Sequence, residues 1–341
     1  MKSYESCLLC PRSCGVNRLA GQRGYCGETA ELRIAFAGIH NGEEPLLKGK
    51  GGSGTIFVSG CNLGCAFCQC FQVSQGRDIF EKKLSPHETS RTVNTAEFAE
   101  ICLALQEKGA ENINIVTGSH AAPAIAKGFA EARKQGLVIP ALWNSSGYDG
   151  EETLEIIKDF VDVYMPDLKT LDPSIAAKFS NAPDYPEQAK ATILKMMKFR
   201  KPRFGPSLGK SNGEEVMLSG VMIRHLIIPG FLENTRQVLR WFAENCNGND
   251  NYKGNGDFQG RALLSLMTQY TPARIPGIKT IIPNRCVSED EYDAVLSMLD
   301  EFGIDDGFCQ ELTSGTTWLP DFNLPNPFPP GISEPMWHWR K

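Results

Sequence analysis

The sequence lacks the features that would place the chain in a membrane, on an export route or on nucleic acid. It contains no run of about 18 apolar residues, so no segment is expected to span a bilayer. Its first residues lack the apolar stretch of a secretory signal, and its formal net charge is only −5 over 341 residues. We therefore expect a cytoplasmic protein that binds neither membranes nor nucleic acid.

A glycine-rich nucleotide-binding motif is also missing. No Gly-x-Gly-x-x-Gly pattern follows the first predicted strand, Thr55–Val58, which argues against an open dinucleotide-binding sheet. A loop with Cys61, Cys65 and Cys68 stands in that place, in a chain that has 12 cysteines in all. Clustered cysteines in a long chain without an export signal bind metal more often than they form disulfides.

Apolar runs rich in β-branched residues alternate with segments of helical periodicity from about residue 54 onward. Six runs are predicted to be strands: Thr55–Val58, Ile113–Val116, Val138–Leu142, Val161–Met165, Met222–Ile228 and Ala262–Met267. One helix is expected to begin at Thr95 and stop at Gly109, and the last has a capping box at Ser288 and Glu291. This repeat predicts an α/β fold with a parallel sheet, in the form of a partial (β/α)6 TIM-like barrel.

Composition divides the chain into three parts. Residues 1–50 are predicted to form a Cys-rich metal-binding extension, residues 51–318 the (β/α)6 core, and residues 319–341 a proline-rich tail extended over the surface. The extension carries four cysteines, Cys7, Cys10, Cys14 and Cys26. Four thiolates suit a closed site, either tetrahedral zinc or an auxiliary [4Fe–4S] cluster, and the number of ligands does not separate the two.

The loop after the first strand offers three thiolates, one fewer than a [4Fe–4S] cluster has irons. Ordinary electron-transfer clusters take four cysteines, so an iron without a protein ligand indicates a site where a small molecule binds the metal. S-adenosylmethionine has an amine and a carboxylate that can chelate this iron, and a sulfonium that can accept an electron. Its cleavage gives methionine and a 5′-deoxyadenosyl radical, which abstracts hydrogen from an unactivated C–H bond. A structural zinc site is the alternative.

Cys61-x3-Cys65-x2-Cys68, with an aromatic residue before the last cysteine, resembles the signature of the radical S-adenosylmethionine (SAM) superfamily. Three later segments resemble strand ends of glycyl-radical-enzyme activating enzymes such as the pyruvate formate-lyase activase: Trp143–Tyr148, Tyr164–Lys169 and Ile223–Gly230. The resemblance extends over the whole chain to iron–sulfur proteins related to that activase. It implies a radical SAM oxidoreductase that takes hydrogen from a glycyl-radical-enzyme partner. Modification of a peptide or small metabolite, and non-catalytic electron transfer, are the alternatives.

The resemblance also implies roles for side chains at the C-terminal ends of the strands, where α/β barrels place their active sites. Asp167 and Lys169 would face the cofactor and Arg224 would project toward it or the substrate, so Lys169 and Arg224 are the predicted catalytic residues. A monovalent-cation site is implied on Asn144, Ser145, Asp167 and the Met165 carbonyl. Asn144 stands where the family has an acid, and an amide attracts a cation less strongly than a carboxylate does.

The turn after the second predicted strand departs from the family pattern. Relatives usually carry a Gly-Gly-Glu-Pro run there, which holds the amino group of the cofactor. This chain has Thr117, Gly118 and Ser119, whose carbonyl and hydroxyl oxygens are predicted to make that contact without an acid. His120 is either a replacement for the missing acid or an ordinary loop histidine.

Three further features have ordinary alternatives. Cys70 is interpreted as a bystander thiol, although a four-cysteine cluster would use it as the fourth ligand. Cys102 fits the apolar stripe of its helix and is predicted to lie in the core. The basic run Lys190–Lys210 is either a docking strip for an acidic flavodoxin- or ferredoxin-type reductant or a solvated helix face.

Overall fold

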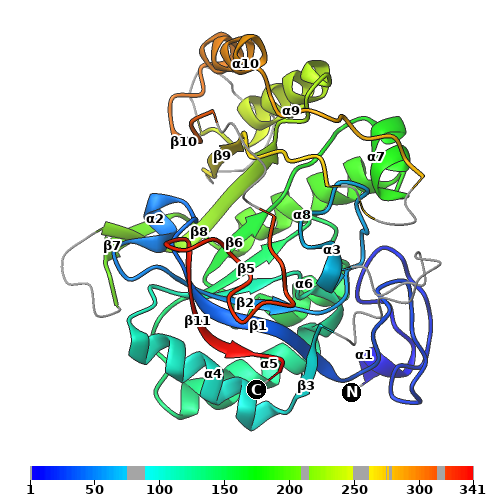
Figure 1. The fold of residues 1–341 in the computed structure, drawn as a ribbon, viewed down its shortest axis with the longest axis vertical. Helices are drawn as coiled ribbons and strands as arrows, with labels where there is room; N and C mark the ends of the chain where they lie inside the picture. The colour runs from blue at the N-terminus through cyan, green and yellow to red at the C-terminus, as the bar shows by residue number, and fades with distance from the viewer. Residues whose placement is uncertain are drawn as a thin grey trace.

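The computed structural model describes residues 2–74, 89–208, 215–248, 261–273, 275, 279–312 and 319–340. Its centre is an 11-stranded sheet (Figure 1) in the order β10-β9-β8-β6-β5-β4-β2-β1-β11, with β3 paired to β1 and β7 to β8. The strands are β1 (Leu32–His40), β2 (Ser53–Val58), β3 (Arg91–Val93), β4 (Ile113–Val116), β5 (Ala141–Ser145), β6 (Val163–Pro166), β7 (Arg203–Pro206), β8 (Glu215–Leu226), β9 (Leu263–Met267), β10 (Gly307–Cys309) and β11 (Ser333–His338).

Every neighbouring pair from β2 to β10 in this order is parallel. Within the described residues the outer strands β10 and β11 do not pair, so the sheet remains open. The prediction of an α/β fold with a parallel sheet, built as a partial TIM-like barrel, is confirmed.

All six predicted strands are present; β4 has the predicted ends, and the other five have shifted ones. β5 begins at Ala141 instead of Val138, because Pro140 has no N–H to donate and the Val138 side chain is 60% exposed. β8 ends at Leu226 instead of Ile228, before the turn at Pro229 and Gly230. A seventh parallel strand, β10, was not predicted, because three residues are too few to show a period.

Most of the helices in the described residues lie between successive parallel strands, as the alternating pattern predicts, and the first two precede β2. The helices are α1 (Lys2–Glu5), α2 (Pro45–Lys48), α3 (Phe71–Ser74), α4 (Thr95–Lys108), α5 (Ala122–Lys134), α6 (Glu151–Ile157), α7 (Pro173–Ser180), α8 (Tyr185–Phe199), α9 (Leu232–Asn245) and α10 (Glu289–Phe302). Figure 1 shows α9 and α10 together at one end of the molecule and α4 and α5 at the other. The capping box at Ser288 and Glu291 starts α10 as predicted. Among the described residues no helix has the length and apolar character needed to cross a membrane.

Helices α4 and α5 show how the predicted stripe is buried. The side chain of Asn94 caps α4 by accepting from the Glu97 N–H, and Gly109 ends it in the left-handed conformation. Phe98 of α4 packs on α5 at Gly128, where an added Cβ would lie 2.2 Å from the Phe98 ring. Cys102 is fully buried in the same core, as predicted.

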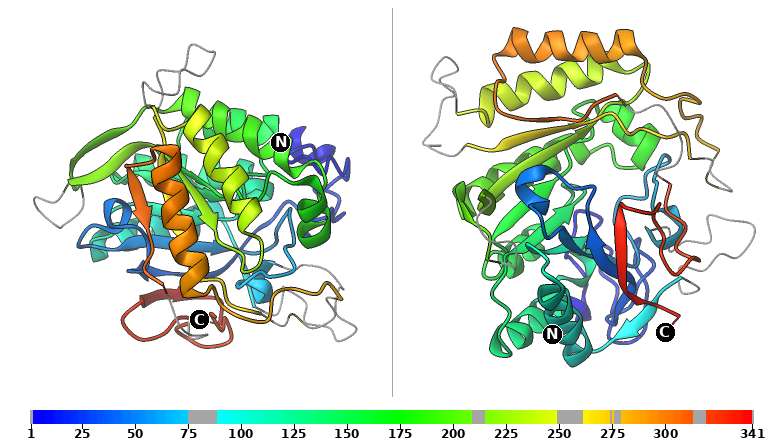
Figure 2. Two further views of the ribbon diagram at one scale, coloured as in Figure 1. Left: turned by 90° about the horizontal axis from the view of Figure 1, so that it is seen from above. Right: turned by 60° about the vertical axis from the view of Figure 1, so that its left-hand side comes forward.

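Segments from both ends of the chain enter the sheet. β1 lies within the predicted extension and pairs antiparallel with β2, and β11 of the predicted surface tail pairs antiparallel with β1. Figure 2 shows the blue β1 and the red β11 side by side. Because β1 leads directly into α2, which contacts β8, residues 41–48 pass beside the strands of the core.

Candidate active site

A pocket of about 210 Å³ opens at the C-terminal ends of the parallel strands. Its lining joins the cysteine loop to residues that follow or end β4, β5, β6, β8 and β9. The predicted site residues in this lining are Cys61, Cys65, Cys68, Thr117, Asn144, Ser145, Asp167, Lys169 and Arg224. A larger pocket, of about 410 Å³, lies at the opposite ends of β9 and β10, beside Leu263 and Gly307, and has none of these residues.

The cysteine loop brings its sulfur atoms into one neighbourhood. Burial raises the pKa of Cys68, and repulsion from Cys70, Cys65 and Cys61 adds to the rise. Cys70, the interpreted bystander, also lines the pocket, and burial raises its pKa to about 12. The hydroxyl of Ser180, at the end of α7, lies 3.4 Å from the Cys65 sulfur.

Within the described residues no three His, Cys, Asp or Glu side chains stand together as a preformed metal site. The loop thiols nevertheless suit an iron–sulfur cluster in their chemistry, because cysteine sulfur is the usual ligand of such clusters. Burial also raises the pKa of Cys65. The Cys65 and Cys68 thiols are therefore protonated at neutral pH, and metal binding would displace their protons.

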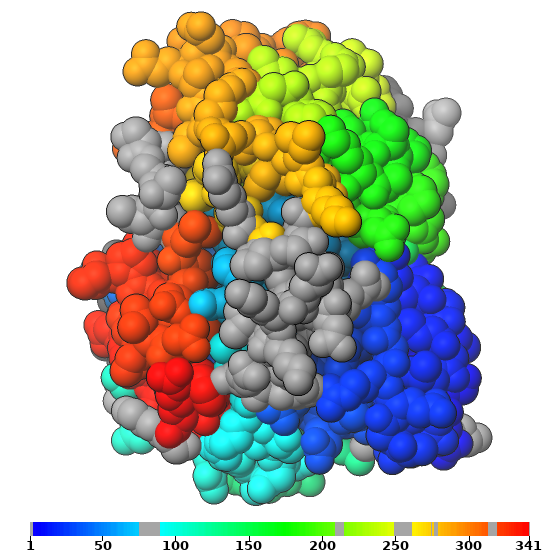
Figure 3. Space-filling model, turned by 45° about the vertical axis from the view of Figure 1, so that its right-hand side comes forward, coloured from blue at the N-terminus to red at the C-terminus, as the bar shows by residue number. Residues whose placement is uncertain are grey.

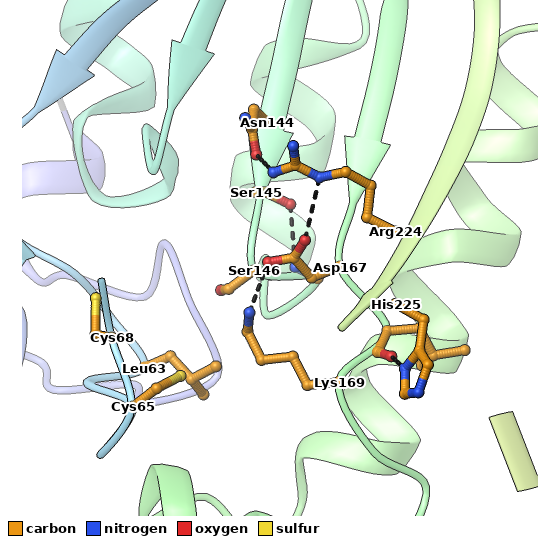
Figure 4. Close-up of polar contacts among 12 residues, drawn as sticks. Leu63, Cys65, Cys68, Asn144, Ser145, Ser146, Asp167, Lys169, Arg224 and His225 are labelled. Carbon is orange, nitrogen blue, oxygen red and sulfur yellow. Dashed lines mark hydrogen bonds and ion pairs between the residues drawn. The ribbon is translucent and has the colours of Figure 1, made fainter. Parts of the chain in front are cut away.

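A chain of charged groups crosses the pocket beside the loop (Figure 4). The Lys169 ammonium donates to Asp167 Oδ2 at 2.6 Å, and Arg224 Nε lies 3.5 Å from Asp167 Oδ1. Arg224 Nη2 also donates to Asn144 Oδ1 at 2.9 Å. Burial by itself would raise the pKa of Asp167, but the attraction of Lys169 and Arg224 outweighs it and lowers that pKa. Asp167 is therefore a carboxylate, and both cations keep their charge.

The segment around Lys169 is held from behind by two buried side chains. The hydroxyl of Tyr185, on α8, lies 2.8 Å from the Asp167 carbonyl oxygen and accepts from the Lys169 N–H at 3.0 Å. His225, next to Arg224 on β8, lies 2.7 Å through Nδ1 from the Leu168 carbonyl oxygen, and burial lowers its pKa to about 4. A neutral imidazole and a phenol thus orient Asp167 and Lys169 without adding charge.

Two acidic residues that the sequence did not indicate, Glu43 and Glu44, lie next to this group of charged side chains. Glu43 Oε2 lies 3.3 Å from Arg224 Nη1, and its Oε1 accepts from the Asn114 amide at 3.1 Å. Its neighbour Glu44 accepts from the Ser265 hydroxyl at 2.6 Å. Both acids lie between β1 and α2, in a segment without periodicity, and adjacent acids ahead of a proline are common in surface turns. Only the fold, which brings β1 beside the barrel, reveals them.

The turn after β4 is divided between the pocket and the core. Thr117 lines the pocket and has φ +61°, a left-handed conformation that is rare for a β-branched residue. Gly118 and Ser119 are absent from the lining, and the Ser119 hydroxyl donates to the buried Asp149 at 2.7 Å. The Ser145 hydroxyl, although at the pocket, also donates to Asp149, at 2.6 Å. Gly118 and Ser119 therefore lie outside the lining of this pocket, and Ser119 meets Ser145 only through their shared partner Asp149.

His120 is buried against the backbone. Its Nε2 lies 2.7 Å from the Ser59 carbonyl oxygen, just ahead of the cysteine loop, and its own carbonyl oxygen accepts from Arg18 of the extension. Burial and the nearby Arg18 lower the pKa of His120 to about 3. A neutral histidine enclosed in this way supports the structural alternative.

The four cysteines of the extension also share one neighbourhood. Burial raises the pKa of Cys10 to about 12, with repulsion from Cys26, Cys7 and Cys14. Burial likewise raises the pKa of Cys26 to about 11. All four are free thiols, and none belongs to the lining of the strand-end pocket.

Arg12, between Cys10 and Cys14, fastens the extension to the cysteine loop. Its guanidinium donates to the carbonyl oxygens of Asn62 (3.0 Å) and Leu63 (3.3 Å), both between Cys61 and Cys65. It also donates to the carbonyl oxygens of Ser180 (2.9 Å) and Asn181 (2.5 Å) at the end of α7. Its guanidinium carbon lies 3.7 Å from the centre of the Tyr25 ring. Figure 3 shows the blue extension directly below the green segment that contains α7.

Comparison with known proteins agrees with this arrangement. Residues 55–216 match the family model of the Radical SAM superfamily. An uncharacterized protein of Methanocaldococcus jannaschii is 28% identical over 309 residues, 89% of this chain and 76% of that protein. Residues 55–216 therefore belong to the radical SAM superfamily, and this match supports an enzyme of the radical SAM class.

Among solved structures, SuiB of Streptococcus suis bound to S-adenosylmethionine matches with a TM-score of 0.44 and 13% identity over 73% of this chain. The matched part is 48% of SuiB, so the chain spans about half the length of that protein. A domain of the pyruvate-formate lyase-activating enzyme from Bacteroides vulgatus matches with a TM-score of 0.34 and 13% identity, over 55% of this chain and 90% of that domain.

Proposed function

We propose that this enzyme reductively cleaves S-adenosylmethionine at a [4Fe–4S] cluster held by Cys61, Cys65 and Cys68. One observation carries the proposal: these thiols line the same pocket as Asp167, Lys169 and Arg224. When bound, the cluster supplies the electron that breaks the cofactor's C–S bond, and methionine and 5′-deoxyadenosine are formed after hydrogen leaves the substrate. The class of the enzyme supports the same cofactor pair.

The side chains in the pocket match the polar groups of the cofactor. Lys169 and Arg224 offer N–H donors and positive charge to a carboxylate, and Asn144 and Asp167 offer acceptors to an amine or hydroxyl. Asp167 Oδ1 has no hydrogen-bond partner in the described part of the chain, although it lies near the Arg224 cation. A buried acceptor in this state favours a bound donor. Asn144 and Asp167, together with Ser145 and the Met165 carbonyl, are our proposal for a monovalent-cation site.

The hydrogen donor is proposed to be a protein of the glycyl-radical-enzyme type, because the strand-end segments resemble those of glycyl-radical-enzyme activating enzymes. A peptide or small metabolite is the second candidate.

We also propose that Cys7, Cys10, Cys14 and Cys26 hold zinc or a second [4Fe–4S] cluster. A flavodoxin- or ferredoxin-type protein would supply the electron. Lys195, in the basic strip, pairs with Glu155 of α6 at 2.9 Å, so that part of the strip behaves as a solvated helix face.

Anaerobic reconstitution tests the cleavage. The reconstituted protein, reduced with dithionite and mixed with S-adenosylmethionine, should form 5′-deoxyadenosine and show a cluster EPR signal that shifts when the cofactor is added. A signal that does not shift, or absence of 5′-deoxyadenosine from a cluster-loaded sample, would refute the proposal. Iron and zinc analysis of the same sample identifies the metal of the extension. A glycyl EPR signal on a candidate partner separates the two substrate classes.

A further inference from the structure

A second pocket, of about 230 Å³, adjoins the cofactor pocket and shares Arg224, Met267 and Gln269 with it. Its opposite wall is the segment between β1 and α2, which contributes Glu43 and Glu44. Arg224 therefore separates two compartments: Asp167 lies on its cofactor side and Glu43 on the other. The proposed function uses only the first compartment.

Glu43 is fully engaged within the protein. Its side chain is 9% exposed, its Oε2 faces the Arg224 guanidinium, and its Oε1 accepts from the Asn114 amide. His40 also lies near it, at 3.9 Å, but burial lowers the pKa of His40 to about 4, so this imidazole carries no charge at neutral pH. Glu43 thus pairs with Arg224, the one guanidinium that the described residues contribute to the lining of this pocket.

Glu44 makes no ion pair within the described residues; burial raises its pKa, and the positive charge of Arg224 offsets only part of that rise. Glu44 is the N-cap residue of α2, but its side chain makes no capping hydrogen bond, and its Oε1 is occupied by the Ser265 hydroxyl. Its Oε2 is buried and has no hydrogen-bond partner in the described ranges, where no ion pair to Glu44 occurs either. A buried carboxylate oxygen without a donor is costly unless a ligand supplies one.

Asn114 gives an independent sign of a missing donor. This β4 residue is fully buried, and its amide nitrogen is committed to Glu43. Its carbonyl oxygen, Oδ1, has no hydrogen-bond partner among the described residues. Of these two acceptors, only Glu44 belongs to the lining of the second pocket. An acid without an ion pair there favours a ligand that carries N–H donors and a positive charge, and an ammonium group has both properties.

We propose that this second pocket binds the protonated amine of the substrate, with Glu44 Oε2 as its main acceptor. The inference rests on the proposed function, because it places the substrate across Arg224 from the cofactor. It specifies the substrate as an amine, carried either by a free small molecule or by a lysine side chain of a peptide. Arg224 is then shared between the two ligands, and Glu43 keeps its guanidinium in position.

Isothermal titration calorimetry on the reconstituted, S-adenosylmethionine-loaded enzyme tests the proposal with matched probes. Pentan-1-amine and 1-pentanol represent the free source, and Nα-acetyl-lysine methylamide and Nα-acetyl-norleucine methylamide represent the peptide source. At least one ammonium probe should bind ten times more tightly than its neutral counterpart. The source whose ammonium probe binds more tightly identifies the carrier of the amine. Equal binding within both pairs, or no binding by either ammonium probe at 10 mM, would overturn the inference.

The Glu44→Gln variant should lower the affinity for the ammonium probe about tenfold and leave that for the neutral probe within twofold. Glu334→Gln, at an exposed acid on β11, is the matched control and should bind as the wild type does. Unchanged ammonium binding in a folded Glu44→Gln variant would contradict the assignment. If that variant does not fold, the comparison of each ammonium probe with its neutral counterpart on the wild-type enzyme still tests the inference. Failure of cofactor cleavage is recognised separately, because 5′-deoxyadenosine is measured without any probe.

Discussion

The two groups of cysteines differ in what surrounds them, although both gather free thiols near one another. The extension offers four thiols, of which Cys7 and Cys26 are buried and Cys14 is exposed, and none of them lines the strand-end pocket. The loop offers three thiols at the rim of a pocket that also contains Asp167, Lys169 and Arg224. A complete ligand set without neighbouring reactive groups is typical of a structural site, whereas an incomplete set beside charged groups is typical of a catalytic one.

Arg12 connects the two groups of cysteines physically, because it belongs to the extension and hydrogen-bonds to the cysteine loop. The extension holds the backbone between Cys61 and Cys65 through the Arg12 guanidinium and through the Tyr25 hydroxyl, which donates to the Leu63 carbonyl oxygen at 3.3 Å. A structural site in the extension would therefore keep the catalytic loop in shape.

The largest expected effect follows removal of one loop thiol. Cys65→Ala should abolish the cluster signal that shifts with S-adenosylmethionine, and also the formation of 5′-deoxyadenosine, because two thiols do not retain the loop cluster. Cys70→Ala is the control and should retain both, since Cys70 is not expected to be a ligand. EPR and product analysis of the two variants make the measurement. A Cys70→Ala protein that loses its cluster would instead support four-cysteine ligation and electron transfer.

Asp167→Asn should be the next most damaging change. It leaves the buried cations of Lys169 and Arg224 without their shared carboxylate, and breaking a buried ion pair costs about 3–5 kcal/mol. We expect urea denaturation to show that loss at pH 7. Lys134→Ala, which removes an exposed pair with Glu131, should change stability by less than about 1 kcal/mol.

The pH dependence of the stability of Asp167→Asn tests whether the lost carboxylate charge causes the destabilisation. The pKa of Asp167 is lowered in the folded state, so its contribution is complete above its unfolded pKa of about 4 and is lost as the pH falls through the folded pKa. Stability should therefore fall less steeply below about pH 4 in Asp167→Asn than in the wild type. If the stability of the two proteins fell equally steeply below about pH 4, the Asp167 carboxylate would not be the group whose protonation destabilises the wild type.

Arg12→Ala tests the connection between the two regions. Hydrogen bonds from a charged donor contribute about 1.5–3 kcal/mol each, and Arg12 donates to four carbonyl oxygens, some of them partly exposed. We expect a loss of roughly 2–4 kcal/mol and a lower iron content after reconstitution. Arg12→Lys should recover little, because an ammonium cannot reach four carbonyls at once. Normal iron content in Arg12→Ala would show that the cysteine loop binds its cluster without help from the extension.

Ser288→Ala should have the smallest effect. It removes the N-cap of α10, far from both groups of cysteines in sequence, and should cost about 1 kcal/mol. Cluster content and 5′-deoxyadenosine formation should match the wild type. A drop in either would mean that general destabilisation, and not a local contact, explains the Arg12 result.

Much of this protein could be predicted from local patterns. The strands and the two ends of α4 follow from hydrophobic period and capping residues, which act over a few neighbouring positions. The residues of the pocket that follow the strands, such as Asn144 and Asp167, could be predicted because parallel strands deliver their C-terminal ends to one edge. Ser119 shares that position in sequence, yet its hydroxyl turns to Asp149, and no local pattern distinguishes the two outcomes.

The sequence by itself determined the chemistry of the loop, because three thiols at close spacing are near one another in any fold, and it determined the class of fold, because periodicity is local. Only the tertiary structure decided what faces those thiols. Glu43 and Arg224 are 181 positions apart, and Arg12 and Ser180 are 168 apart. Such pairs meet only after β1 joins the sheet and the extension packs on α7, since their contact depends on the path of the backbone and not on the residues between them.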